Sequence, residues 1–97
     1  MPTDYEVTYI LRPGLEDAEV ETRVNELSET LKGGGAEIVG EVEKMGKRRL
    51  AYEIKDVREG HYVVMKFKSG AAEAKEFERQ LRLNDDVLRH LLIKLDD

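Results

Sequence analysis

The sequence predicts an α+β fold in which a four-stranded antiparallel sheet carries two helices on one face. Four runs of alternating or continuous apolar residues indicate strands, and two runs with apolar residues at helical spacing indicate helices. The runs occur in the order βαββαβ, and right-handed crossovers between them place both helices on the same side of the sheet. With 97 residues, the chain fits a single domain over residues 1–97.

The first strand and the first helix have the clearest patterns. The strand, YEVTYILR at 5–12, places Tyr5, Val7, Tyr9 and Leu11 on one face and Glu6, Thr8, Ile10 and Arg12 on the other. A Pro-Gly turn at 13–14 follows it. The helix is predicted from Leu15 to Lys32, with Val20, Val24, Leu27 and Leu31 at helical spacing. Three glycines at 33–35 are expected to end this helix, because glycine readily adopts the left-handed conformation that closes one.

A long strand is predicted from Glu37 to Ile54. Its alternation slips between Val39 and Val42, with glycines at positions 40 and 46, which indicates a bulge. The segment 55–60, KDVREG, is predicted to be a hairpin loop, and 61–68, HYVVMKFK, to be the third strand.

The second helix and the last strand complete the pattern. Ser69 is expected to cap a helix whose apolar positions are Ala74, Phe77 and Leu81. After a turn at 84–86, the stretch Val87–Leu95 is a strand that is apolar on both faces. The arrangement is ferredoxin-like, with the first and third strands in the centre of the sheet and the second and fourth at its edges.

The sheet face away from the helices is expected to be partly apolar. The alternation places on it Ile10, Tyr62 and Val64, and of the last strand's apolar residues we favour Leu91 and Ile93. An exposed apolar group on a sheet suggests a docking site, although scattered surface hydrophobic residues are also common. Base stacking of the kind used by RNA-recognition motifs is disfavoured, since Tyr62 is the one outward aromatic residue and Glu6 would repel phosphate.

The composition disfavours a solitary nucleic-acid binder and a membrane protein. The net charge is −5, whereas affinity for nucleic acid comes from neutralising phosphates. An acidic chain can still contact nucleic acid through clustered cations or with a basic partner. The N-terminus has no basic segment followed by an apolar core, and no apolar run approaches about 18 residues. We therefore expect a soluble, cytoplasmic protein with no membrane partner.

The sequence has no pattern typical of an enzyme or a metal site. It has no cysteine, and its two histidines, His61 and His90, lie on different strands without an obvious carboxylate partner. The loop 12–17 has one glycine, a proline and two acids, unlike the phosphate-binding loop of the ferredoxin-like acylphosphatases. We expect no catalytic residues, no metal, no cofactor and no small-molecule substrate.

One segment carries a family resemblance. GKRRLAYEIK at 46–55 resembles the hallmark of the bacterial small ribosomal subunit protein six family: glycine, a basic residue two positions later, then Leu-Ala-Tyr and isoleucine. Further similar positions are Tyr5-Glu6-Val7, Leu11 with Pro13, Gly60-His61-Tyr62, and the stretch 81–85 followed by Val87. The resemblance covers essentially the whole chain, in order and without large gaps.

The resemblance implies a structural, non-enzymatic protein of the small ribosomal subunit. It would pair with small-subunit protein eighteen, and the pair would bind the central domain of the small-subunit (16S) ribosomal RNA. The candidate cations for RNA or the partner are Lys44, Lys47, Arg48 and Arg49. A purely structural role is the alternative, in which these charges keep an edge strand from pairing with other chains. Edge protection and partner binding are compatible. The alternative function is a ferredoxin-like module that homodimerises through its sheet and senses or binds a ligand.

Overall fold

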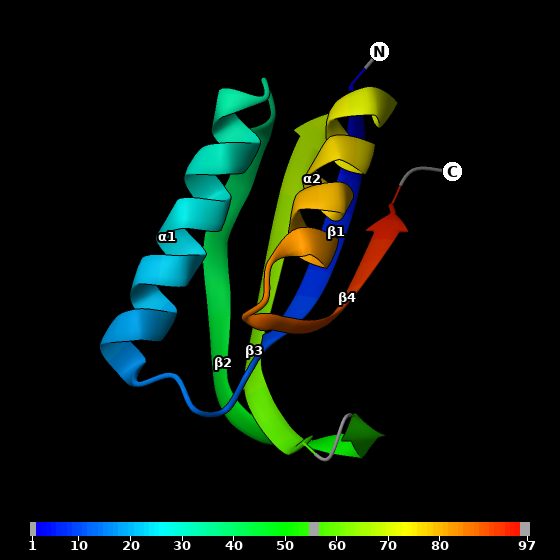
Figure 1. Ribbon diagram of the computed structural model, residues 1–97. Helices are drawn as coiled ribbons and strands as arrows, with labels where there is room; N and C mark the ends of the chain where they lie inside the picture. Colours follow the sequence, from blue (N-terminus) through cyan, green and yellow to red (C-terminus); the bar gives the residue numbers. More distant parts are fainter. Residues whose placement is uncertain (1, 55–56, 96–97) are drawn as a thin grey trace.

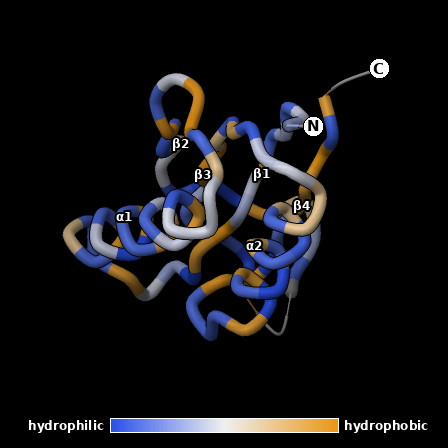
Figure 2. Tube along the Cα trace, turned by 90° about the horizontal axis from the view of Figure 1, so that it is seen from above, coloured by the Kyte–Doolittle hydropathy of each residue, from blue (hydrophilic) through white to orange (hydrophobic). Residues whose placement is uncertain are grey.

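The computed structural model describes residues 2–54 and 57–95 and has the predicted order of elements (Figure 1). The elements are β1 (Thr3–Leu11), α1 (Asp17–Gly33), β2 (Glu37–Ile54), β3 (Val57–Ser69), α2 (Ala71–Leu83) and β4 (Val87–Lys94). They form one antiparallel sheet with the strand order β2-β3-β1-β4. Both helices lie on the same side of the strands (Figure 2). The predicted ferredoxin-like fold and its central and edge strands are confirmed.

The hydrophobic core lies between the helices and one face of the sheet. β1 and β3 contribute to it the buried side chains of Tyr5, Val7, Tyr9, Leu11, Val63, Met65 and Phe67. Val7 lies opposite Met65 in the register, and residues directly opposite each other in an antiparallel pair share a face. The ring of Phe67 stacks on Tyr5 with centroids 5.4 Å apart and meets the edge of Phe77 from α2 at 5.9 Å. The face assignment made from alternation in these two strands is therefore confirmed.

Helix α1 begins two residues later than predicted and ends at the expected glycines. Its N-cap is Glu16, whose backbone N–H donates to Oε1 of Glu19 at 3.1 Å, a local bond that favours this start. Leu15 is left in the preceding loop, where it is nonetheless buried. At the other end, Gly35 has φ of 101°, a left-handed conformation that stops the helix.

The capping residue of α2 differs from the prediction. The N-cap is Gly70, and Ser69 is the last residue of β3, paired with Thr3 of β1. The Ser69 hydroxyl donates to the carbonyl oxygen of Gly70 at 2.9 Å and caps no helical N–H group. The prediction failed because the β1–β3 ladder extends one residue further than the alternation indicated, and so takes Ser69 into the sheet.

The bulge in β2 is confirmed, and the register shows more than one irregularity. The pairing with β3 shifts between Val39 and Glu43, between Lys44 and Gly46, and again after Arg49. Gly40 and Gly46 have φ of 73° and 82°, which glycine adopts without strain.

The hairpin loop between β2 and β3 is shorter than predicted. β3 begins at Val57, and the ladder continues through the pairs Arg48–Gly60 and Arg49–Glu59. The predicted loop at 55–60 is therefore wrong for residues 57–60, while residues 55–56 lie outside the described residues. The prediction failed because residues 57–60 lack a clear apolar alternation, yet Val57, Glu59 and Gly60 pair with β2.

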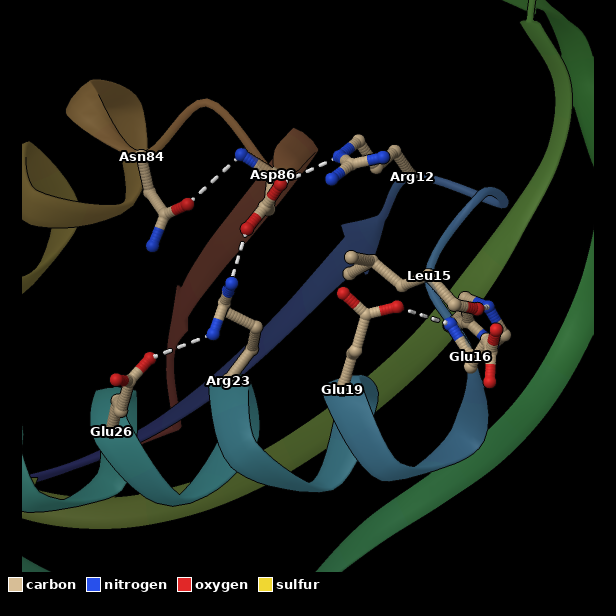
Figure 3. A network of polar contacts seen from close by, with 9 residues as sticks. Arg12, Leu15, Glu16, Glu19, Arg23, Glu26, Asn84 and Asp86 are labelled. Carbon is tan, nitrogen blue, oxygen red and sulfur yellow. Dashed lines mark hydrogen bonds and ion pairs between the residues drawn. The ribbon is translucent and has the colours of Figure 1, made fainter.

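A polar network joins three elements at one end of the sheet (Figure 3). The Asp86 carboxylate, in the turn before β4, accepts hydrogen bonds from Nε of Arg12 and Nε of Arg23, each at 2.6 Å. These bonds, that from Arg23 first, hold the pKa of Asp86 below its ordinary value near 3.8. Because Arg12 follows β1 and Arg23 lies in α1, the network fastens the α2–β4 turn to both.

Candidate functional site

The sheet face away from the helices, called here the open face, gathers the five residues predicted for it. The register places Ile10 between Tyr62 and Arg89, and Thr8 between Val64 and Leu91, while Ile93 lies opposite Glu6. Leu91 is 58% exposed and Ile93 42% exposed, and the side chains of Tyr62 and Val64 are half-buried. The five predicted residues therefore share one face of the sheet over β3, β1 and β4, with Thr8 and Glu6 of β1 among them.

Ile10 differs from the other four, because it is only 7% exposed. Residues 50–52, near the end of β2, line a groove together with Ile10 and residues of β4. Part of the open face is therefore a groove and not a flat surface. Figure 1 shows β2 and β3 running past the other strands and turning toward the side of β4. The groove has a volume of about 330 Å³ and is lined by Thr8, Ile10, Leu50, Ala51, Tyr52, Tyr62, Arg89, His90 and Leu91.

The groove residues that were not predicted for this site include Leu50, Tyr52 and Arg89. Leu50 is buried, and Arg89 lies over the ring of Tyr52 with its Cζ atom 5.0 Å from the ring centroid. A guanidinium in this position is attracted by the electron-rich face of the ring. Leu50 and Tyr52 belong to the Leu-Ala-Tyr part of the motif at 46–55, which was the available signal; Arg89 had none.

Gly60 allows β3 to pack closely on the end of β1, beside the groove residue Ile10. A Cβ atom at this position would lie 2.5 Å from Cγ2 of Ile10 and 2.8 Å from the carbonyl oxygen of Leu11. No side chain larger than hydrogen fits there without a shift of the β1 backbone.

The four candidate cations are all exposed, but they are not equally available. Lys44 forms an ion pair with Glu21 of α1, and Nε of Arg48 donates to the carbonyl oxygen of Met45 at 3.3 Å. Within residues 2–54 and 57–95, Lys47 and Arg49 have no ion-pair partner.

The four cations also divide between the two faces of the sheet. Lys44, Lys47 and Arg49 lie opposite Val63, His61 and Glu59, which point toward the helix side. Arg48 lies opposite Gly60, whose neighbour Ile10 is on the open face. The sequence alone does not decide which of Arg48 and Arg49 faces RNA.

The two histidines have structural contacts. His61 is buried, and its Nε2 lies 3.1 Å from the carbonyl oxygen of Leu15, which attaches the β1–α1 loop to β3. Nε2 of His90 lies 3.4 Å from Oε2 of Glu78 on α2. The expectation that neither histidine has a carboxylate partner is therefore wrong for His90, because α2 packs beside β4.

In the part of the chain that the structure describes, no helix is long and apolar enough to cross a membrane.

Comparisons with known proteins agree with one another. The profile of the family described as "Ribosomal protein S6" matches residues 4–94. The chain is 50% identical over 92 residues to the small ribosomal subunit protein bS6 of Desulforudis audaxviator, covering 95% of this chain and 97% of that protein. It is 45% identical over 96 residues to the bS6 protein of Carboxydothermus hydrogenoformans, covering 99% of each.

Solved structures show the same likeness. The crystal structure of the 30S ribosomal protein S6 from Thermotoga maritima superposes with a TM-score of 0.89 at 28% identity, covering 97% of this chain and 88% of that one. An uncharacterized protein from Thermotoga maritima, with a TM-score of 0.60 at 17% identity over 99% of this chain and 100% of that one, shares the fold alone.

Proposed function

Because this chain belongs to the ribosomal protein S6 family, and is therefore a non-enzymatic, cytoplasmic component of the small ribosomal subunit, we propose how it is held there. It pairs with small-subunit protein eighteen through the open face, and the pair binds the central domain of the small-subunit ribosomal RNA.

The observation that carries this proposal is the exposed apolar surface of the open face. Leu91 and Ile93 are about half exposed and share the open face with Val64 and Tyr62 on the other side of β1, and neither helix of the described residues lies on this face. Exposed apolar side chains gathered on one sheet face are typical of a protein–protein interface. Burying it against a partner removes apolar area from water, which is the main driving force of association.

Electrostatics supports a partner that shares the binding of RNA. The chain carries a net charge of −5, and only part of its candidate cation cluster is free of ion pairs within the described residues. Each phosphate contact releases counterions and adds to affinity, so a few cations on an acidic chain give weak binding. A basic partner supplies the remaining contacts and is itself attracted to the acidic chain.

The test is to measure binding of a central-domain RNA fragment at physiological salt with and without protein eighteen. We expect weak binding by this protein alone and an increase of orders of magnitude with the partner, with a steep salt dependence set largely by the partner's cations. Tight binding by the isolated protein would refute the proposal. Sedimentation of the isolated protein separates it from the homodimeric alternative, which requires self-association.

A further inference from the structure

Resting on the proposed function, we infer that the three consecutive cations of β2 serve two different partners. Lys47 and Arg49 contact ribosomal RNA phosphates, whereas Arg48 faces protein eighteen. The three cations are adjacent in the sequence, but on this assignment they do not form one binding site.

The division follows from the pairing of β2 with β3. Lys47 lies opposite His61 and Arg49 opposite Glu59, and both of these β3 residues are on the side of the sheet that carries the helices. Arg48 lies opposite Gly60, next to Ile10 of the open face. Because successive side chains of a strand point to opposite faces, the three cations cannot all reach one flat partner.

Occupation of the open face decides which cations remain for RNA. Once protein eighteen covers Leu91, Ile93 and Tyr62, Arg48 lies on the covered side. Lys44, on the other side, is held by Glu21 of α1. Among the described residues of β2, the cations that stay accessible on the uncovered side are Lys47 and Arg49.

Both remaining cations are free to bond phosphate. Each is exposed, and neither forms an ion pair within the described residues. Arg49 lines an open groove with Pro13 and Val57, and a guanidinium can bind a phosphate through two parallel hydrogen bonds. Glu59 lies opposite Arg49 on the same side, so its charge opposes the approach of phosphate.

The experiment measures the affinity of the preassembled heterodimer for the central-domain RNA as a function of salt, together with the affinity of the two proteins for each other. We expect Lys47→Ala and Arg49→Ala each to reduce the slope of log affinity against log salt by about 0.7–0.9, the loss of one phosphate contact, with pairing unchanged. Arg48→Ala changes a side chain on the covered side, so it should alter the affinity of pairing and leave the RNA salt slope unchanged.

Three further variants serve as controls. Lys75→Ala removes one exposed cation from α2 and should change neither measurement. Arg49→Lys retains the charge and should retain the slope. Glu59→Gln removes the opposing charge and should raise RNA affinity. Circular dichroism verifies that each variant is folded.

Two failures are distinguishable. If the unsubstituted pair does not form or does not bind the RNA, the proposed function is refuted, and this assignment with it. If it binds but Arg48→Ala reduces the RNA slope, or Lys47→Ala and Arg49→Ala leave it unchanged, the assignment alone is overturned.

Discussion

Adding one methyl group at Gly60 tests how closely β3 packs on the end of β1. A Cβ atom there would lie 2.5 Å from Cγ2 of Ile10 and 2.8 Å from the carbonyl oxygen of Leu11, both well inside normal contact. The oxygen belongs to the backbone, so relief requires the strand to move. Overpacking of this kind costs about 1–3 kcal/mol, and the smaller conformational entropy of alanine in the unfolded chain returns about 0.4–1 kcal/mol. We therefore expect Gly60→Ala to lower the free energy of unfolding by about 1–2 kcal/mol.

Denaturant unfolding of Gly60→Ala beside Gly33→Ala gives the measurement its control. Gly33 is the last residue of α1, is exposed, and would have nothing within 4 Å of a new Cβ atom. Its substitution should leave stability unchanged or raise it by up to about 1 kcal/mol. If the two variants are equally stable, the close contact between β3 and β1 at Gly60 does not constrain the sheet, and the reasoning from this contact is wrong.

Two further predictions concern the open face and pH. Leu91→Asp should change the free energy of unfolding by no more than about 1 kcal/mol, but it should abolish pairing with protein eighteen in a pull-down experiment. Phe77→Ala should lower the free energy of unfolding by about 3–5 kcal/mol, because it leaves a cavity in the core. The reverse pattern would mean that the two faces of the sheet are exchanged. Because hydrogen bonds from Arg23 and Arg12 lower the pKa of Asp86 in the folded state, that stabilisation is present above the unfolded pKa and is lost as the pH falls through the folded value. Asp86→Asn should therefore show a shallower loss of stability below about pH 4 than the unsubstituted protein in pH-dependent unfolding, and equal slopes would contradict the role of Asp86.

The sheet and its faces were predictable because the relevant signals are local. In β1, Val7 and Tyr9 alternate with Glu6 and Thr8, and burial against the helices follows that alternation. β4 carried less information, since it is apolar on both sides. There the pairing of Thr8 with Leu91 decides which side chains point outward.

The groove could not be predicted in the same way. Ile10 reads as an ordinary outward residue of β1, and its burial depends on residues 50–52, about forty positions away. The course of β2 before these residues includes register shifts, which a period-two pattern does not show. The contact of Arg89 with Tyr52 is likewise purely tertiary.

The position of the cations along β2 explains why an acidic chain places three of them in succession. β1 pairs with β3 only as far as the pair Leu11–His61, so the pairs Arg48–Gly60 and Arg49–Glu59 lie in a ribbon of β2 and β3 alone. The sheet is therefore narrowest there. Because a strand alternates its faces at every residue, charge on both sides of such a ribbon requires consecutive cations, and cations two apart would serve one side only. Lys47 and Arg48 already offer positive charge to both sides, and Arg49 adds a second cation on the side of Lys47. Lys44, three residues earlier, holds β2 to α1.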